Sequence, residues 1–476
     1  MNTLDARALA ALCDKETGTA PRGPRRAVVL GASLAGLLAA RVLHEHVDEV
    51  LLLERHALPM DLGPRETMPH THHTHALLAR GRQVIEQLFP GIGDEWMAAG
   101  GRLGDVGSDA LFYAGRRRFA QAPADAQAIC LGRSAIEGVL RWRVRALPRI
   151  TLVSGVEATG LLGAADRSAV TGLHWRLRDE PAGDRRTLRA DLVVDASGRG
   201  SRLPKWLVEL GHDAPREEQV HCQIRYATAY LQREPQHAPG LEAVICAATP
   251  DHPRPSVLLS QEGGRWVVTQ GGYGEDAPPL DREGFIRRAQ EAAPSELAAV
   301  VRDAQFLCEP FGYRFPHSQR RRYERSSLPA GVLAIGDSIC SFNPVFGQGM
   351  SVAACEALAL QQALQAGAAI DRGLARRYFR AAARSIDIAW QTAVGADLAI
   401  PSVQGERPLP VRLINAYVAK VFDAAQTDPD VAVAFERVSH LLEAPPTLMR
   451  PAMLARVLSA RWRRPADATR PAVAAA

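Results

Sequence analysis

The sequence predicts an α/β protein built on a doubly wound parallel sheet, with an inserted antiparallel-sheet domain and a helical C-terminal region. Three observations predict this class. Residues 27–53 contain an apolar segment, a helix-forming segment and a second apolar segment, the order of a β-α-β unit. Two more short apolar segments, 192–195 and 332–335, end in acidic or glycine-containing turns, so the parallel sheet draws strands from distant parts of the chain. Between them, residues 219–230 and 256–272 are rich in β-forming residues.

Length and composition indicate a globular protein of two or three domains, because 476 residues with 47% hydrophobic and 23% charged side chains exceed one ordinary core. The longest promising apolar run, residues 27–40, contains two glycines and is shorter than the roughly 20 residues that span a bilayer. We therefore expect no transmembrane segment. The first 25 residues carry three acidic residues and lack the apolar block of a signal peptide, so we expect a cytoplasmic protein.

Cysteine and charge patterns exclude several other classes. The seven cysteines are scattered, odd in number and form no CxxC pair, which argues against a disulfide framework or a zinc ribbon. The net charge is only +5, and the arginines are interleaved with acidic residues along the chain. We therefore expect no nucleic-acid partner.

The order of these patterns divides the chain into five parts. Residues 1–25 read as a loose N-terminal arm, and residues 26–214 as the first part of the nucleotide-binding domain. Residues 215–315 read as a substrate domain of mostly antiparallel sheet, and residues 316–370 return to the nucleotide-binding domain. From 371 to 476 the pattern is helical and broken by prolines.

The first motif with chemical meaning is Gly31-Ala32-Ser33-Leu34-Ala35-Gly36, between the first predicted strand and the first predicted helix. In this Rossmann-like arrangement a tight turn lets backbone N–H groups and a helix N-terminus hold a pyrophosphate. Glu54, at the end of the next strand, would accept hydrogen bonds from an adenosine ribose. Ser33 stands where the fingerprint has its second glycine, and a turn that only packs strand against helix is the alternative.

Two further motifs follow predicted strands in the same manner. Asp195-Ala196-Ser197-Gly198-Arg199 comes after the segment at 192–194, and Gly336-Asp337-Ser338 comes after the segment at 332–335. A turn, Asn343-Pro344-Val345-Phe346-Gly347-Gln348-Gly349-Met350, then precedes a helix. Three motifs in this order resemble the FAD-dependent monooxygenases of the aromatic-hydroxylase and epoxidase group, the class A flavoprotein monooxygenases. The resemblance covers roughly residues 26–361.

The resemblance implies FAD as cofactor and ten residues that bind it: Gly31, Ser33, Gly36, Glu54, Arg133, Asp195, Asp337, Pro344, Gly347 and Gly349. The first four would bind the ADP half, and the last three would lie against the flavin ring. Arg133 would lie near the pyrophosphate, Asp195 near FAD and NAD(P)H, and Asp337 beside the ribityl chain. A helix beginning near Gly349 would point its positive end at the ring, and glycines there would leave no Cβ in the way. A surface role for Arg133 and a turn-capping role for Asp195 are the alternatives.

Four histidines close together at positions 70, 72, 73 and 75 suggest a metal site at first sight. A metal site needs fixed geometry and supporting partners that this spacing does not supply, so we expect no metal. The segment instead resembles the loop in which this family carries a His-x-His pair near the flavin. His73 and His75 are the matching positions, and they are candidates for groups near the flavin rather than certain catalytic residues.

The activity that the resemblance implies is insertion of one oxygen atom from O2 into a hydrophobic small molecule, by hydroxylation or epoxidation, through a flavin C4a-hydroperoxide. NADPH or NADH would be the electron donor, and secondary metabolism the setting. No Ser-His-Asp or nucleophilic-cysteine signature competes with this interpretation. A halogenase is disfavoured because the WxWxIP signature is absent.

Several alternatives stay open. A flavin-dependent reductase or dehydrogenase of the geranylgeranyl-reductase type would share the cofactor, as would a non-redox FAD-binding protein or a cyclase. A separate flavin reductase is an alternative source of electrons. Residues 448–464 are basic and amphipathic, so peripheral membrane contact stands beside ordinary core packing as their role.

Overall fold

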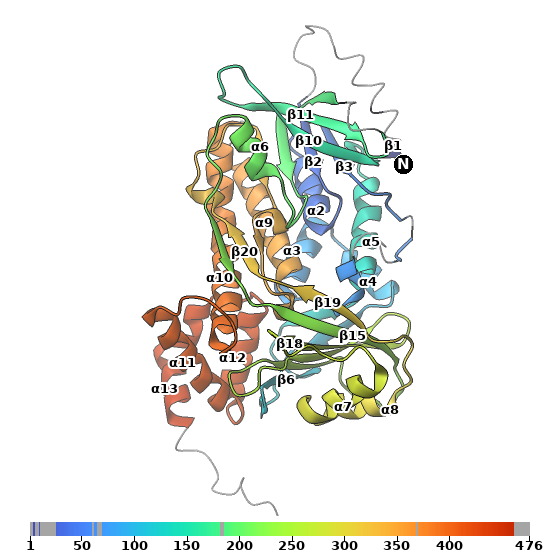
Figure 1. Ribbon diagram of the computed structural model, residues 1–476, viewed down its shortest axis with the longest axis vertical. Coiled ribbons are helices and arrows are strands. Elements are labelled where there is room, and N and C mark those ends of the chain that lie inside the picture. The colour runs from blue at the N-terminus through green and yellow to red at the C-terminus, as the bar shows by residue number, and fades with distance from the viewer. Residues whose placement is uncertain are drawn as a thin grey trace, which may run out of the picture.

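The computed structural model describes residues 3–4, 9, 25–59, 61–63, 69–180, 185–367 and 370–460. Figure 1 shows the parallel sheet in the upper part of the molecule, a second sheet in the lower part and the long helix α10 (Arg372–Ala399) beside both. Among the described residues, no helix is both long enough and apolar enough to span a bilayer.

The parallel sheet has the strand order β1-β9-β3-β2-β13-β21, and every pairing in it is parallel. Its strands come from widely separated segments: β1 (Thr3–Leu4), β2 (Arg26–Leu30), β3 (Glu49–Glu54), β9 (Ile150–Ser154), β13 (Leu192–Asp195) and β21 (Val332–Ala334). The strands are apolar without alternation because helices cover the sheet. The predicted fold class is confirmed.

The helices of this half of the molecule include α2 (Leu34–Leu43), α3 (Ala79–Leu88), α4 (Ile92–Ala98), α5 (Arg133–Arg145) and α9 (Gly349–Gln365). Helix α2 is buried along almost its whole length and packs against both α5 and α9. A smaller sheet, β10 (Val156–Gly163), β11 (Val170–Leu177) and β12 (Arg186–Arg189), and the short helix α6 (Leu203–Glu209) complete it.

The second large sheet has seven strands in the order β19-β15-β18-β17-β16-β6-β7. They are β6 (Ala110–Ala114), β7 (Arg117–Arg118), β15 (Ile224–Gln232), β16 (Ala243–Ala247), β17 (Ser256–Gln261), β18 (Arg265–Tyr273) and β19 (Phe311–Phe315). Helices α7 (Arg282–Ala292) and α8 (Ser295–Asp303) bury Phe285 and Leu297 in one core with Trp266.

This sheet reaches outside the expected segment 215–315, because β6 pairs in parallel with β16 and brings β7 with it. Local sequence gives no sign of a pairing between strands some 130 residues apart. The exact domain boundaries stay predictions.

Two small sheets connect the halves. One consists of β4 (Ala76–Leu77), β8 (Gln127–Cys130) and β5 (Arg102–Asp105), and the other of β14 (Glu217–Val220), β20 (Ser318–Arg321) and β22 (Cys340–Ser341). Short 3-10 helices lie at Pro69–His72, Tyr323–Arg325, Gly336–Ser338, Pro344–Phe346 and Pro445–Met449.

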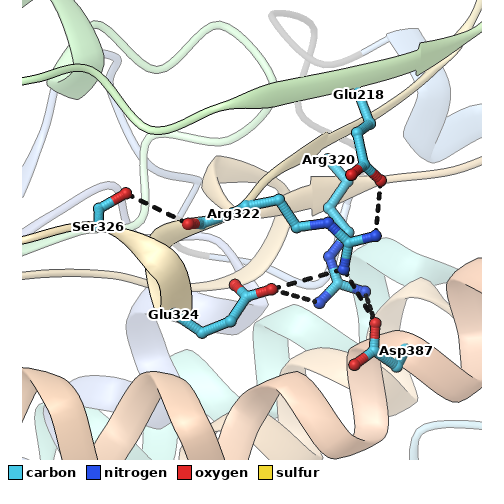
Figure 2. A network of polar contacts seen from close by, with 6 residues as sticks. All are labelled: Glu218, Arg320, Arg322, Glu324, Ser326 and Asp387. Atoms are coloured by element: carbon cyan, nitrogen blue, oxygen red, sulfur yellow. Dashed lines mark hydrogen bonds and ion pairs between the residues drawn. The ribbon is translucent and has the colours of Figure 1, made fainter.

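The C-terminal region is helical, as predicted, with α11 (Leu409–Ala425), α12 (Pro429–Ser439) and α13 (Pro451–Ser459) after α10. Figure 2 shows the ionic network that fixes α10 to the nucleotide-binding half. The buried Arg320 guanidinium lies 2.5 Å from the Asp387 carboxylate on α10 and 3.2 Å from Glu324. Arg322 contacts Asp387 at 3.0 Å and Glu218 at 2.6 Å. The buried Arg320 and the mostly buried Arg322 thus both have charged partners, which offset their desolvation.

Candidate functional site

A single cavity of about 1740 Å³ joins the predicted motifs. Eight of the ten predicted cofactor residues line it, together with both histidine candidates: Gly31, Ser33, Glu54, Arg133, Asp337, Pro344, Gly347, Gly349, His73 and His75. Gly36 and Asp195 lie behind its wall. The convergence follows from topology, because β2, β3, β13 and β21 are neighbouring parallel strands whose carboxyl ends share one edge.

The turn after β2 has the geometry that the first motif predicts. Gly31 has φ +104°, and a Cβ at this residue would lie 2.5 Å from the Ala196 carbonyl oxygen. Its N–H donates to the Leu53 carbonyl at 2.7 Å. Gly36 lets α2 approach the turn closely, since a Cβ there would meet the Gly31 oxygen at 1.8 Å. Only glycine therefore suits either position.

Ser33, Arg133 and Glu137 form a polar cluster at the N-terminus of α2. The Ser33 hydroxyl donates to Glu137 at 2.6 Å, and Arg133, the first residue of α5, donates to Glu137 at 2.9 Å and to the Ser33 hydroxyl at 3.2 Å. Arg133 is thus held at the fingerprint turn rather than free on the surface. Sequence reasoning missed Glu137, whose contact with Ser33 spans 104 residues.

Glu54 closes β3 and is almost fully buried. One carboxylate oxygen accepts the Ala32 N–H at 2.9 Å, and the other accepts the His56 N–H at 3.1 Å. Glu54 therefore fixes the turn and at the same time lines the cavity as an acceptor.

Asp195 is fully buried and turns its carboxylate into its own loop. It accepts the Ser197 N–H at 2.9 Å and also the Ser201 hydroxyl. These are the contacts of the turn-capping alternative. Arg199 of the same motif reaches the cavity, where its guanidinium lies 4.8 Å from the Phe315 ring centre and donates to the Ser341 hydroxyl at 3.2 Å.

Asp337 and the turn after it present an open surface to the cavity. The Asp337 side chain is exposed there, and Pro344, Gly347 and Gly349 are exposed beside it, while Gln348 is buried. Although the Asp337 carboxyl faces the cavity, the surrounding protein desolvates it and raises its pKa, and the Arg133 and Arg199 charges oppose this effect.

Glycine conformations keep this surface open. Gly347 has φ +65°, and a Cβ built on Gly349 would meet no atom within 4 Å. The cavity thus combines a pyrophosphate-type turn, the acidic acceptor Glu54 at the end of the neighbouring strand and a surface without Cβ atoms at Gly347 and Gly349. These residues fit FAD.

Glu356 on α9, which the sequence analysis did not identify, supports this surface from behind. Its buried carboxyl accepts the Gly336 N–H. Burial raises the pKa of Glu356 to about 8, and the neighbouring Asp337 adds to this effect.

His73 is a buried neutral side chain in an aromatic surrounding. Its Nδ1 shares a hydrogen bond of 2.7 Å with the Thr228 hydroxyl, and its ring centre lies 5.2 Å from those of Phe311 and Tyr313. Burial lowers the pKa of His73 to about 4. His75 donates from Nδ1 to the His73 carbonyl at 2.8 Å. The His70 side chain lies outside the described residues, and among those described no group of three His, Cys, Asp or Glu is placed to hold a metal ion.

Beyond the turn at 344–349, the cavity continues as a mostly apolar chamber lined by the seven-stranded sheet and the C-terminal helices. The sheet and helices contribute apolar side chains to its walls: Phe112, Ile245, Val257, Leu259, Trp390, Val394, Phe422 and Leu448. The wall from α10, α11 and α12 has no motif that a single sequence reveals.

Comparisons with known proteins identify the family and the fold. Residues 25–384 match the family model described as FAD binding domain. The chain is 33% identical over 448 residues to Protein Rv3254 of Mycobacterium tuberculosis (strain ATCC 25618 / H37Rv), covering 90% of this chain and 92% of that protein. Similar folds include flavin-dependent brominase Bmp2, with a TM-score of 0.64, 16% identity and coverage of 90% of this chain and 98% of that one. p-Nitrophenol 4-monooxygenase PnpA from Pseudomonas putida DLL-E4 has a TM-score of 0.60 and 17% identity, covering 87% and 99%.

Proposed function

Because this chain belongs to the FAD binding domain family and shares its fold with flavin-dependent enzymes, we propose that it is an FAD-dependent monooxygenase. Its substrate is a hydrophobic small molecule. The observation that carries the proposal is the continuity of one cavity, in which the nucleotide turn, the Asp337 surface and the apolar chamber follow one another.

When bound, FAD would take two electrons from NADPH or NADH and pass them to O2, so that one oxygen atom enters the substrate and the other leaves as water. The chain's own residues bind the cofactor and orient the substrate beside it. The ten predicted residues hold the cofactor, eight of them at the cavity wall, while Gly36 and Asp195 act by shaping the turns behind it.

Residues around the flavin turn favour negative charge at that end of the cavity. Helix α9 begins at Gly349, and the first N–H groups of a helix have no intrahelical acceptors. Arg133 and Arg199 add positive charge near Asp337. The apolar chamber limits water around the reacting atoms. His73, neutral near pH 7, positions groups through hydrogen bonds rather than through charge.

The test is isotopic. The purified, FAD-loaded protein is incubated with NADPH or NADH and a panel of apolar aromatic and alkene compounds under isotopically labelled O2. We expect one labelled oxygen atom in a product found by mass spectrometry. Product formed equally well without O2 would replace the proposal with a flavin-dependent reductase. Turnover that needs an added flavin reductase would make this chain the oxygenase of a two-component system. A cytoplasmic location stays a prediction.

A further inference from the structure

Two buried polar side chains, one on α12 and one directly after its last residue, line the cavity from a part of the chain beyond residues 25–384, which the family model covers. Glu436 is 6% exposed and His440 is 7% exposed. The two residues are four positions apart, and the His440 N–H donates to the Glu436 carbonyl at 2.9 Å. This helical spacing places both side chains on one face.

The pair lies close to the turn at residues 344–349, which we propose lies against the flavin and call the flavin turn. Gln348, within that turn, donates from its side chain to the Ser439 carbonyl at 3.2 Å. The Ala79 N–H donates to His440 Nδ1 at 3.4 Å. The end of α12 is thus docked against the start of α9, so any group held by Glu436 and His440 lies beside the cofactor turn.

In the part of the chain that the structure describes, neither the Glu436 carboxyl nor His440 Nε2 has a hydrogen-bond partner. No described group donates to or pairs with the Glu436 carboxyl. Because His440 Nδ1 accepts from Ala79, Nε2 carries the ring proton, and it has no described acceptor. The side-chain oxygen of Gln348 is also buried without a partner. Glu436 and His440 line the cavity, so their unpaired polar groups face any molecule bound there, and the buried Gln348 oxygen adds a third group without a partner in the described chain.

The nearby Asp105 carboxylate, unlike that of Glu436, has a full set of hydrogen-bond partners. It accepts N–H groups from Gly107, Ala124 and Ala126 at 2.9, 2.9 and 3.0 Å. Despite burial, these bonds lower the pKa of Asp105, so it stays ionised and needs no further partner.

The charge states define what the pair can recognise. Burial raises the pKa of Glu436 to about 8, and the Asp105 anion adds to this effect. Burial lowers the pKa of His440 to about 4. Near pH 7 the pair therefore presents an uncharged O–H and an uncharged N–H donor. A ligand carboxylate would be repelled by Asp105, and an ammonium group would meet two N–H or O–H donors with only the carbonyl oxygen of the Glu436 carboxyl as acceptor.

We propose that Glu436 and His440 form a recognition site for an uncharged oxygen acceptor, a carbonyl or hydroxyl group, on an otherwise apolar substrate. The site orients that substrate beside the flavin turn. The inference rests on the proposed function only for the statement that the ligand is the substrate.

The test compares four naphthalene probes by equilibrium dialysis against the FAD-loaded protein: 2-acetylnaphthalene, 2-isopropylnaphthalene, 2-naphthoate and 2-naphthylmethylammonium. The first two have nearly the same shape and differ in the carbonyl oxygen. We expect the wild-type protein to bind the ketone roughly tenfold more tightly than the hydrocarbon, the effect of about one net hydrogen bond in a buried site. Glu436→Leu and His440→Leu each reduce this ratio, and the double variant brings it to about one.

Two further variants serve as controls. Glu436→Gln keeps N–H donors at the site, so it should retain more of the ratio than Glu436→Leu. Asp430→Asn removes a carboxylate from the exposed side of the same helix, where Asp430 pairs with Arg456, and should leave the ratio unchanged. FAD content and melting temperature show that each variant is folded.

A ketone preference that survives both leucine substitutions, retention of neither neutral probe, or tighter binding of either charged probe would overturn the proposal. Dialysis needs no turnover, so the outcome is separate from that of the labelled-oxygen experiment. A protein that inserts no oxygen yet loses its ketone preference in Glu436→Leu would refute the monooxygenase proposal and leave this site in place.

Discussion

Gly349→Ala should weaken FAD binding without destabilising the protein itself. Gly349 is the first residue of α9, and its backbone has ordinary helical geometry rather than a positive φ. A Cβ at this residue meets no protein atom within 4 Å, because it points into the cavity. The same substitution at Gly31 behaves differently, since its Cβ would lie 2.5 Å from the Ala196 oxygen and its φ of +104° excludes other residues.

The expected free-energy changes separate the effect of Gly349→Ala on protein stability from its effect on FAD binding. Replacing glycine by alanine in a compatible helical position stabilises a fold by about 0.4–1 kcal/mol through the unfolded chain. A methyl group forced against a closely packed ring costs about 1–3 kcal/mol, which corresponds to roughly 5-fold to 150-fold weaker FAD binding. Gly349→Val adds two more methyl groups and should weaken binding further.

The assay is a pair of measurements on apoprotein: thermal unfolding, and titration with FAD followed by the quenching of flavin fluorescence. For Gly349→Ala we expect a melting temperature equal to or above that of the wild type and a clearly raised FAD dissociation constant. For Gly31→Ala we expect both stability and FAD binding to fall. Wild-type FAD affinity in Gly349→Val would refute the reasoning, because the turn then does not approach the ring.

Three other substitutions or conditions give distinct outcomes. Asp337→Ala removes a side chain exposed in the cavity and should lower the FAD retained after gel filtration; full occupancy of that variant would count against the assignment. Glu436→Leu should raise the free energy of unfolding of the apoprotein by about 1–3 kcal/mol, because it removes a buried carboxyl without a partner; lower stability in chemical denaturation would show that this carboxyl has a structural partner. Burial raises the pKa of Glu356 to about 8 and that of Asp397 to about 7, so both hold protons that the unfolded chain releases near pH ~4. The stabilisation that these two protonated groups add to the free energy of unfolding is complete below about pH 4 and is lost as the pH rises toward about 8. Denaturation at a series of pH values should show this decline, and Glu356→Gln should flatten it.

The nucleotide-binding half was predictable because its signals are local. The apolar strand at 27–30, the glycines of the fingerprint and Glu54 stand within one β-α-β unit, and the sheet edge then brings Asp337 to the same place. The family resemblance placed Arg133 near the pyrophosphate; its guanidinium contacts Ser33 in the fingerprint turn, and its role toward the cofactor stays a prediction.

Features that depend on distant contacts were not predictable. Glu137 meets Ser33 and Glu356 meets Gly336 only after the helices have packed. Asp195 is different, because its partners Ser197 and Ser201 lie in its own loop and its contacts are those of the turn-capping alternative that the sequence left open. Glu436 looks like any polar residue on an amphipathic helix until the fold buries it against the cavity.

The most direct test of the central claim is anaerobic spectrophotometry of the purified protein. We predict a flavin absorbance band at one FAD per chain that bleaches on addition of NADPH or NADH and returns when O2 is admitted. A chain that shows no flavin band after reconstitution with FAD would contradict the account.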